Sequence, residues 1–291
     1  MGPRCVIGVD LGGTKILAGV ADAGGTIEQT LEVATPLESQ GELVSALVGV
    51  VEELRTPDVA AVGFGVPGWF DRRTGVVLGA ANVPLRDLAF AEVLSERLRL
   101  PVAAENDASV AALAEHRLGA GQGVADLVLL TLGTGVGGGV VVGGRLLCSW
   151  IELGHMVIVQ NGEPCPGACT GLGHVEAYCT GVAADRLARR VLGPSATAHD
   201  LIEQRHPALV EVGHHLGAAI GSLINVFSPE LVLIGGGFGI AAGDILIEDA
   251  RPVIMREALA PGGERTRIEL AGLGAEAGMI GAALLAADEL A

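Results

Sequence analysis

Residues 6–20 read VIGVDLGGTKILAGV, and residues 128–142 read VLLTLGTGVGGGVVV. Each stretch consists of an apolar run, a glycine-rich turn and a second apolar run, which is the pattern of a β-hairpin. The same layout therefore begins both halves of the 291-residue chain. A chain of this length exceeds one simple domain, and the repeat predicts two similar lobes with a cleft between them.

Strands and helices alternate along the rest of the chain. Apolar runs predict strands at residues 5–10, 15–21, 59–66, 101–104, 127–132 and 231–234, and at VVVGG (140–144) after the second turn. Apolar residues at helical spacing predict helices at residues 42–55, 87–99, 107–118, 176–192, 208–227 and 276–290. This order predicts an α/β fold.

Composition excludes several classes of protein. The formal charge of −16 argues against a nucleic-acid partner, because a protein that binds the phosphate backbone needs a basic surface. The most apolar stretches, around residues 127–142 and 278–287, are short or broken by glycine and make poor membrane spans. The start of the chain lacks signal-peptide architecture, and five cysteines are an odd number for a disulfide framework. We expect a cytoplasmic protein without a membrane partner.

Three glycine turns are candidates for binding phosphate, because such turns expose successive backbone N–H groups. In DLGGTK (10–15) the carboxylate of Asp10 is also suited to organising a hydrated Mg²⁺. Glycines that merely form hairpins remain an alternative for each turn. A dinucleotide-binding loop is disfavoured because VVV, not a helix, follows GTGVGGG, and no GK[ST] motif is present. The candidate ATP-binding residues are Asp10, Gly12, Gly13, Thr14, Lys15, Gly133, Thr134, Gly135, Gly236 and Gly237.

The sequence END at residues 105–107 provides a candidate general base. Asp107 follows a predicted strand and opens a predicted helix, and phosphoryl transfer needs a carboxylate near the attacking hydroxyl. Asn106 beside it can both donate and accept hydrogen bonds. Taken alone, this segment is better explained by Asp107 as a helix cap.

The loop CPGACTGLGHVE, residues 165–176, is a candidate metal site. His155 lies ten residues before Cys165, Cys169 comes four residues after Cys165, and His174 comes five later. Structural zinc takes four Cys or His ligands, so these side chains can surround one ion if the loop folds back. The spacing matches no standard zinc motif, and a loop that happens to contain two thiols explains it equally well.

The order of the motifs resembles that of the ROK sugar kinases, a group that includes bacterial glucokinases. The resemblance is carried by DLGGTKI, GVPGWFDRRTG (65–75), ENDASVAALAE (105–115), GTGVGGG, ELGHM (152–156) and the Cys/His loop, which span nearly the whole chain. It implies a two-lobed actin-like ATPase (ribonuclease H-like) fold. The implied small lobe is residues 1–108, completed by the C-terminal helix 276–291, and residues 109–275 form the large lobe that carries the zinc loop.

The resemblance also assigns roles to residues. It implies that Asp107 takes the proton from the primary hydroxyl of a hexose, with ATP and Mg²⁺ as cofactors. It implies a homodimer or homotetramer. The sugar contacts that it implies, including weaker candidates from GVPG and AANVP (80–84), are Gly68, Asn82, Asn106, Asp107, Glu152, His155 and Glu176.

The Cys/His loop departs from the family pattern in two respects. ROK kinases carry a His followed by CxCGxxGCxE. Counting back from Glu176 puts the last Cys of that pattern at His174, and counting forward from His155 puts the first at Cys165. The middle Cys falls on Cys169 if two residues are inserted. Because imidazole replaces thiolate readily on zinc, the resemblance implies a structural Cys₂His₂ zinc site.

The function that the resemblance implies is ATP-dependent phosphorylation of glucose to glucose 6-phosphate. Kinases for fructose, mannose, allose or an N-acetylhexosamine are alternatives, because pocket shape decides the sugar. A non-catalytic sugar-binding ROK protein is another alternative, which the intact END motif disfavours. A ROK repressor carries a helix-turn-helix domain before the DLGGT strand, and only six residues precede Ile7 here, so we expect no such activity.

Overall fold

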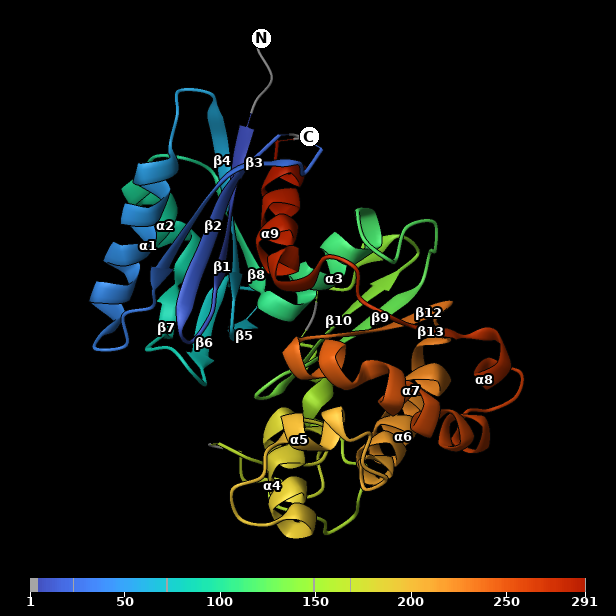
Figure 1. Cartoon of the computed structure of the whole chain (residues 1–291). Coiled ribbons are helices and arrows are strands. Elements are labelled where there is room, and N and C mark those ends of the chain that lie inside the picture. Colours follow the sequence, from blue (N-terminus) through green and yellow to red (C-terminus); the bar gives the residue numbers. More distant parts are fainter. Residues whose placement is uncertain (1–4, 23, 72, 149, 168, 291) are drawn as a thin grey trace. The chain divides into compact units, whose positions relative to one another are not determined.

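Two five-stranded sheets with matching topology form the framework of the protein (Figure 1). The computed structural model describes residues 5–22, 24–71, 73–148, 150–167 and 169–290. It divides into two units: the described residues of 1–118, 148–150 and 276–291 form the first, and those of 119–147 and 151–275 form the second. The first unit therefore includes all of the helix after END, whereas the boundary expected from the sequence follows residue 108.

The first unit contains the first sheet, a small second sheet and four helices in its described part. Its elements are β1 (Cys5–Leu11), β2 (Lys15–Ala21), β3 (Ile27–Ala34), α1 (Gln40–Leu54), β4 (Val59–Val66), β5 (Gly68–Asp71), β6 (Val76–Ala80), β7 (Arg86–Ala89), α2 (Phe90–Leu98), β8 (Val102–Asn106), α3 (Asp107–Arg117) and α9 (Ala277–Asp288). The five-stranded order is β3-β2-β1-β4-β8, and β5-β6-β7 form the small antiparallel sheet. Strands β1, β4 and β8 run parallel, whereas β2 and β3 are antiparallel.

Helix α9 brings the C-terminal end of the chain onto β1 and β4, on the face opposite α1 and α2 (Figure 1). The approach is so close that the facing strand positions are glycines. A Cβ on Gly8 would lie 2.1 Å from the Met279 carbonyl oxygen, and one on Gly63 would lie 1.8 Å from that of Ala282. These two glycines therefore set the packing distance between helix and sheet. Ala291, the last residue of the expected helix, lies outside the described residues.

The second unit repeats the sheet. Its elements are β9 (Leu127–Leu132), β10 (Val136–Val142), β11 (Arg145–Leu146), the short 3₁₀ helices η1 (Leu153–His155) and η2 (Val175–Ala177), α4 (Gly181–Leu192), α5 (Ala198–Glu203), α6 (Leu209–Phe227), β12 (Leu231–Gly235), α7 (Gly237–Glu257), α8 (Gly262–Arg265) and β13 (Arg267–Leu270), with η3 (Gly274–Glu276) at its end. The order β11-β10-β9-β12-β13 has the same parallel and antiparallel pairings as the first sheet. Helices α6 and α7 pack on each other, and α7 packs on β12 and β13.

Several elements differ from the sequence prediction. The glycines of 137–139 belong to strand β10 instead of a turn, and a Cβ on Gly138 would lie only 2.5 Å from Leu153 Cδ1. The helix expected at 176–192 begins at Gly181, because the Thr180 side chain accepts from the Ala183 amide and caps it there. The helix expected at 87–99 begins at Phe90, since β7 pairs with β6.

The sequence analysis missed α7 altogether, a helix of 21 residues that contains Pro252. It also missed the strands β3, β5, β6, β7 and β13, which are short or have few buried residues. Within the described ranges, no helix has the length and hydropathy required to cross a membrane.

Candidate active site and metal centre

Three parallel strands of the first unit end at one sheet edge, and the candidate catalytic carboxylates lie there. Asp10 on β1 pairs with Gly65 on β4, and Val66 on β4 pairs with Asn106 on β8. A Cβ on Gly65 would lie 3.6 Å from Asp10 Oδ1 and 3.4 Å from the Cα of Asp107. Gly65 therefore fills the narrow space between the Asp10 carboxylate and the backbone of Asp107, a role that the sequence analysis missed.

Asp10 lies in an environment that opposes its negative charge. Burial and the charge of Asp107 raise the pKa of Asp10 to about 7, although Lys15 acts in the opposite direction. Part of the burial comes from α9, because a Cβ on Gly278 would lie 2.6 Å from a carboxyl oxygen of Asp10. The sequence analysis missed Gly278 as well, since nothing in an apolar helix indicates which residue faces a distant aspartate.

Asn106, not Asp107, is the N-cap of α3. Its Oδ1 accepts from the amides of Ala108 and Ser109 at 3.0 and 3.1 Å. Asp107 is the first helical residue, and its Oδ1 accepts from the Ala108 amide at 2.8 Å. The helix cap that the sequence analysis considered for Asp107 is therefore provided by Asn106. Burial raises the pKa of Asp107, and its hydrogen bonds lower it.

The first glycine turn lies between β1 and β2. The Gly12 amide donates to the Lys15 carbonyl at 2.9 Å, and a Cβ on Gly13 would lie 3.1 Å from that of Asn82. Asn82 is exposed beside the turn. The Lys15 ammonium is 2.6 Å from a Glu32 carboxylate, with both side chains about half exposed. Such a surface pair contributes little stability, so Lys15 is free to exchange it for a phosphate. Thr14 at the tip is exposed, and Gly68 lies farther along the chain in β5.

The second glycine turn lies among helix starts in the second unit. The Gly133 amide donates to the Gly135 carbonyl at 3.0 Å, and Thr134 between them is exposed. The Gly133 carbonyl accepts from the amide of Gly181, the first residue of α4, at 2.9 Å. A Cβ on Gly181 would also lie 3.6 Å from the Cβ of Phe238 in the first turn of α7. The turn and the starts of α4 and α7 are therefore neighbours.

Gly236 connects β12 to α7 at this place. Its φ of +78° favours glycine, and a Cβ there would lie 2.5 Å from the Leu132 carbonyl oxygen. At Gly237 a Cβ would meet nothing within 4 Å. The positive end of the dipole of a 21-residue helix therefore begins beside open space, an arrangement that favours anions such as phosphate.

Val136, the first residue of β10, connects this turn to the candidate sugar residues. Its amide donates to Oε2 of Glu176 at 2.8 Å. A Cβ on Gly154 would lie 2.3 Å from its carbonyl oxygen, so η1 packs directly against it. Glu152 and His155 flank Gly154 in this turn. The structure thus brings together the three candidate sugar contacts of the second unit, one residue beyond the glycine turn.

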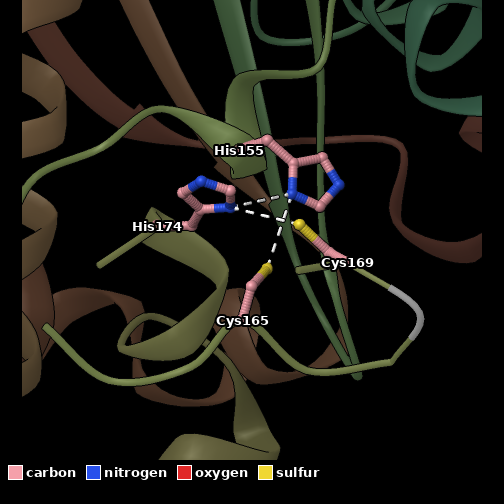
Figure 2. Close-up of side chains that lie close together, drawn as sticks. All are labelled: His155, Cys165, Cys169 and His174. Carbon is pink, nitrogen blue, oxygen red and sulfur yellow. Dashed lines mark hydrogen bonds between the residues drawn. The ribbon is translucent and has the colours of Figure 1, made fainter. Parts of the chain in front are cut away.

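Four side chains gather in a cluster beside this turn (Figure 2). The ligand atoms of His155, Cys165, Cys169 and His174 all lie within 4.8 Å of one another. The two Nδ1 atoms are 3.2 Å apart, Cys165 Sγ is 3.5 Å from His155 Nδ1, and Cys169 Sγ is 3.6 Å from His174 Nδ1. Zinc bonds of about 2.0–2.1 Å to nitrogen and about 2.3 Å to sulfur put tetrahedral ligands about 3.3–3.8 Å apart. The cluster thus has the dimensions of a tetrahedral metal site.

The backbone of the metal loop, which we define as residues 156–174, positions these ligands. The Cys165 amide donates to the Gly171 carbonyl at 2.9 Å, and the Gly173 amide donates to the Glu163 carbonyl at 2.8 Å. The Gly171 amide donates to Cys169 Sγ at 3.4 Å, which suits a thiolate. Without a metal, burial and the neighbouring Cys169 raise the pKa of Cys165 to about 12. Because a thiol ligates as thiolate, only a cation makes this position favourable for a charged sulfur.

The family of the chain follows from comparison with known proteins. A sequence model of the ROK family matches residues 6–289, and the chain therefore belongs to the ROK family. The glucokinase of Streptomyces coelicolor is 34% identical to this chain over 97% of its length and 97% of the relative.

Solved structures show the same relationship. The ROK hexokinase of Thermus thermophilus superposes with a TM-score of 0.86 at 36% identity, covering 99% of both chains. A ROK family glucokinase from Streptomyces griseus, in complex with glucose and AMPPNP, gives a TM-score of 0.83 at 32% identity over 98% of this chain and 99% of the other. The expected two-lobed actin-like ATPase fold is thereby confirmed.

Proposed function

We propose that this chain transfers the γ-phosphoryl group of ATP to the primary hydroxyl of a hexose, with glucose as the preferred substrate. The observation that carries the proposal is the junction at Val136, where a phosphate-binding type of turn continues directly into a strand held by Glu176. A nucleotide phosphate and a polyhydroxylated ligand at this junction would be adjacent. The glucokinase relatives and the complex of one of them with glucose and AMPPNP support the same reaction.

Asp107 is the general base of the proposed reaction. Its Oδ1 accepts from the Ala108 amide, and its own amide and the Asn106 side chain also hydrogen-bond to the carboxylate. These bonds orient the carboxylate toward the role of accepting the proton of the attacking hydroxyl. Burial raises the pKa of Asp107, and a more basic carboxylate is a better proton acceptor near neutral pH. Because Asn106 Oδ1 is occupied at the helix start and its NH₂ also donates to Asp107, the second N–H of this group donates to the sugar.

Asp10 is suited to a hydrated Mg²⁺. Its environment raises its pKa to about 7 through burial and the charge of Asp107, so two oxygen-donor carboxylates lie close without a compensating metal. This donor set fits a hard cation that keeps most of its water. When bound, Mg²⁺ neutralises charge on the transferring phosphate. In the second unit, the turn at 133–135 and the start of α7 at Gly237 offer N–H groups to the nucleotide phosphates. In the first unit, the turn at 12–15 offers N–H groups of the same kind.

The metal cluster is proposed to hold structural zinc. Two thiols and two imidazoles at tetrahedral spacing are the ligand types that zinc prefers. Both histidines present Nδ1 to the cluster, so the Nε2 of His155 is available to a sugar hydroxyl alongside Glu152 and Glu176. A glycine-rich loop loses much chain entropy when it becomes ordered. Zinc in this position offsets that loss by binding four side chains of the loop and its flank.

The reaction is tested with purified, metal-replete protein, ATP, Mg²⁺ and a panel of glucose, mannose, fructose, allose and N-acetylglucosamine. We expect ATP consumption that depends on the sugar and is fastest with glucose. If another sugar is the best substrate, the proposed kinase activity stands and only the proposed preference for glucose is wrong. No ATP consumption with any member of the panel contradicts the kinase and favours a non-catalytic sugar-binding protein.

Zinc is tested by elemental analysis of three proteins. We expect close to one zinc per chain in the wild type and in His174→Cys, because thiolate and imidazole are both good ligands. His174→Ala should lose the metal or hold it weakly. Less than about 0.2 zinc per wild-type chain, against the stoichiometric binding of a closed structural site, contradicts this part of the proposal.

We also propose that the protein is a cytoplasmic homodimer or homotetramer, on the basis of the resemblance and the single, scattered cysteines outside the loop. Light scattering of the purified protein measures its mass in solution directly, and a monomer at all concentrations contradicts self-association.

A further inference from the structure

Tyr178 is the only tyrosine of the chain and comes directly after η2. It is two residues beyond Glu176 and four beyond His174. The amides of Tyr178 and Cys179 both donate to the Val175 carbonyl, at 3.0 and 2.9 Å. This turn is therefore tight, and a displacement of Tyr178 is transmitted to the carboxylate and the metal ligand before it.

The hydroxyl of Tyr178 contacts the other side of the metal loop. It accepts a hydrogen bond from the Glu163 amide at 2.6 Å. A Cβ on Gly162 would lie only 2.1 Å from this hydroxyl, so the loop closes onto it. Glu163 lies two residues before Cys165, and its carbonyl accepts from the amide of Gly173. The hydroxyl therefore holds Glu163 before Cys165, and the Glu163 carbonyl in turn holds Gly173 before His174.

The ring of Tyr178 contacts the core of the second unit. It lies on the ring of His215 in α6, with centroids 4.2 Å apart and the planes tilted by 36°. Helix α6 is anchored by residues such as Val212, Leu216 and Ala219, which are at most 3% exposed. The side chain thus joins an irregular loop to a helix that belongs to the hydrophobic core.

We propose that Tyr178 is a positioning residue, which holds the metal loop and Glu176 in place by linking them to α6 through His215. The inference rests on the function proposed above and adds a specific determinant of sugar affinity and metal retention. Among the described residues, Tyr178 makes its hydrogen bond with Glu163 and its ring contact with His215. Its effect on the reaction is exerted through Glu163 and Glu176.

Tyr178→Phe separates this role from general stability, because it removes the hydroxyl and keeps the ring on His215. We expect the KM for the sugar to rise about three- to tenfold, the range that corresponds to one lost hydrogen bond, with kcat and the KM for ATP changed by less than about twofold. Zinc transfer to a coloured chelator should accelerate by a similar factor. Backbone hydrogen exchange should increase in a peptide that contains Glu163. His215→Ala, which removes the ring contact only, should give a smaller change of the same kind.

Ser39→Ala is the matched control. Ser39 Oγ also accepts from a backbone amide, that of Glu42 at 3.2 Å, at the exposed start of α1 in the first unit. The Ser39→Ala variant should leave the KM for the sugar, the rate of zinc transfer and hydrogen exchange near residue 163 at wild-type values. The proposal is overturned if hydrogen exchange in the peptide containing Glu163 is the same in Tyr178→Phe as in the wild type. It is also overturned if the substitution lowers kcat instead of raising the KM for the sugar. Hydrogen exchange needs neither zinc nor activity, so it decides this inference even if the wild type proves to be no kinase.

Discussion

At the scale of single residues, the neighbouring polar side chains of END have different structural roles. The side-chain oxygen of Asn106 caps the start of α3, so Asp107 is not the N-cap. The carboxylate of Asp107 is then oriented by hydrogen bonds from the Ala108 amide, from its own amide and from the Asn106 side chain. Burial raises the pKa of Asp107, and the pKa of the nearby Asp10 is raised to about 7. The chemistry of the site thus depends on which of two adjacent residues caps the helix.

Asp107→Asn tests the role of the base while keeping the size of the side chain. We expect kcat to fall by roughly 10²–10⁴-fold, the usual contribution of a general base, whereas the dissociation constant of the sugar changes little because the other contacts remain. A kcat within about threefold of wild type, far from that range, would assign the proton transfer to another group.

The wild type should also lose kcat/KM as the pH falls. The base must be ionised, and because burial raises its pKa, protonation begins at a higher pH than for an ordinary Asp of about 3.9. The acidic limb of the pH profile should therefore lie above that value. The residual activity of Asp107→Asn should lack the contribution of Asp107 and keep that of Asp10, whose pKa burial also raises. A wild-type limb at the ordinary value would show that burial does not tune this carboxylate.

At the scale of elements, glycines decide how closely α9 approaches the first sheet. Gly8 and Gly63 face the backbone of α9 at distances that leave no room for a methyl group. The contact brings Gly278 against Asp10, so the same packing that stabilises the unit also buries the carboxylate. Structure and site chemistry are therefore coupled through one helix.

Gly63→Ala should destabilise the protein by about 1–3 kcal/mol, the typical cost of overpacking a filled interior. The new methyl would lie 1.8 Å from the Ala282 carbonyl, a backbone atom that moves only if α9 moves. The control is Gly49→Ala in the interior of α1, where a Cβ meets nothing within 4 Å. It should stabilise by about 0.5–1 kcal/mol, because alanine is the better helix former. Urea unfolding measures both, and a Gly63→Ala protein as stable as wild type would show that α9 does not pack this closely.

At the scale of the whole molecule, the chain uses one architecture twice. Both sheets have three antiparallel strands followed by two parallel ones, and in both units a glycine turn joins the first two strands. The units differ in what surrounds the sheets, including α9 and the small β5-β6-β7 sheet in the first and the metal loop with η1 and η2 in the second. The sheets and their turns carry the candidate carboxylates and phosphate-binding residues, and the metal loop adds the candidate metal ligands.

Removal of the metal should therefore have a local effect in the second unit. After chelation we expect the dissociation constant for glucose to rise about tenfold or more, as for the loss of at least one hydrogen bond to a charged group. The affinity for a non-hydrolysable ATP analogue should change by less than about twofold, since the glycine turns keep their donors. Calorimetric titration measures both ligands, and restored zinc should restore glucose binding. Equal losses for both ligands would contradict a local role of the metal.

Much of the fold could be predicted from the sequence because its signals are local. The hairpins at residues 6–20 and 128–142 follow from apolar runs around glycine turns, and the start of α3 follows from polar residues after a strand. The extent of β10 could not, since its glycines look like a turn and become strand only through pairing with β9 and packing against Leu153. Helix α7 was missed because glycines and Pro252 interrupt its pattern.

The sequence by itself determined which residues are chemically capable: the carboxylates of END and β1, the two thiols, and the histidines of the loop. Tertiary structure alone decided which of them meet and which face each presents. It placed Gly278 over Asp10, tied Glu176 to Val136, and turned both histidine Nδ1 atoms toward the cysteines. The physical reason is range: turn, cap and strand preferences act over a few residues, whereas contacts between distant segments are selected by close packing of the folded chain.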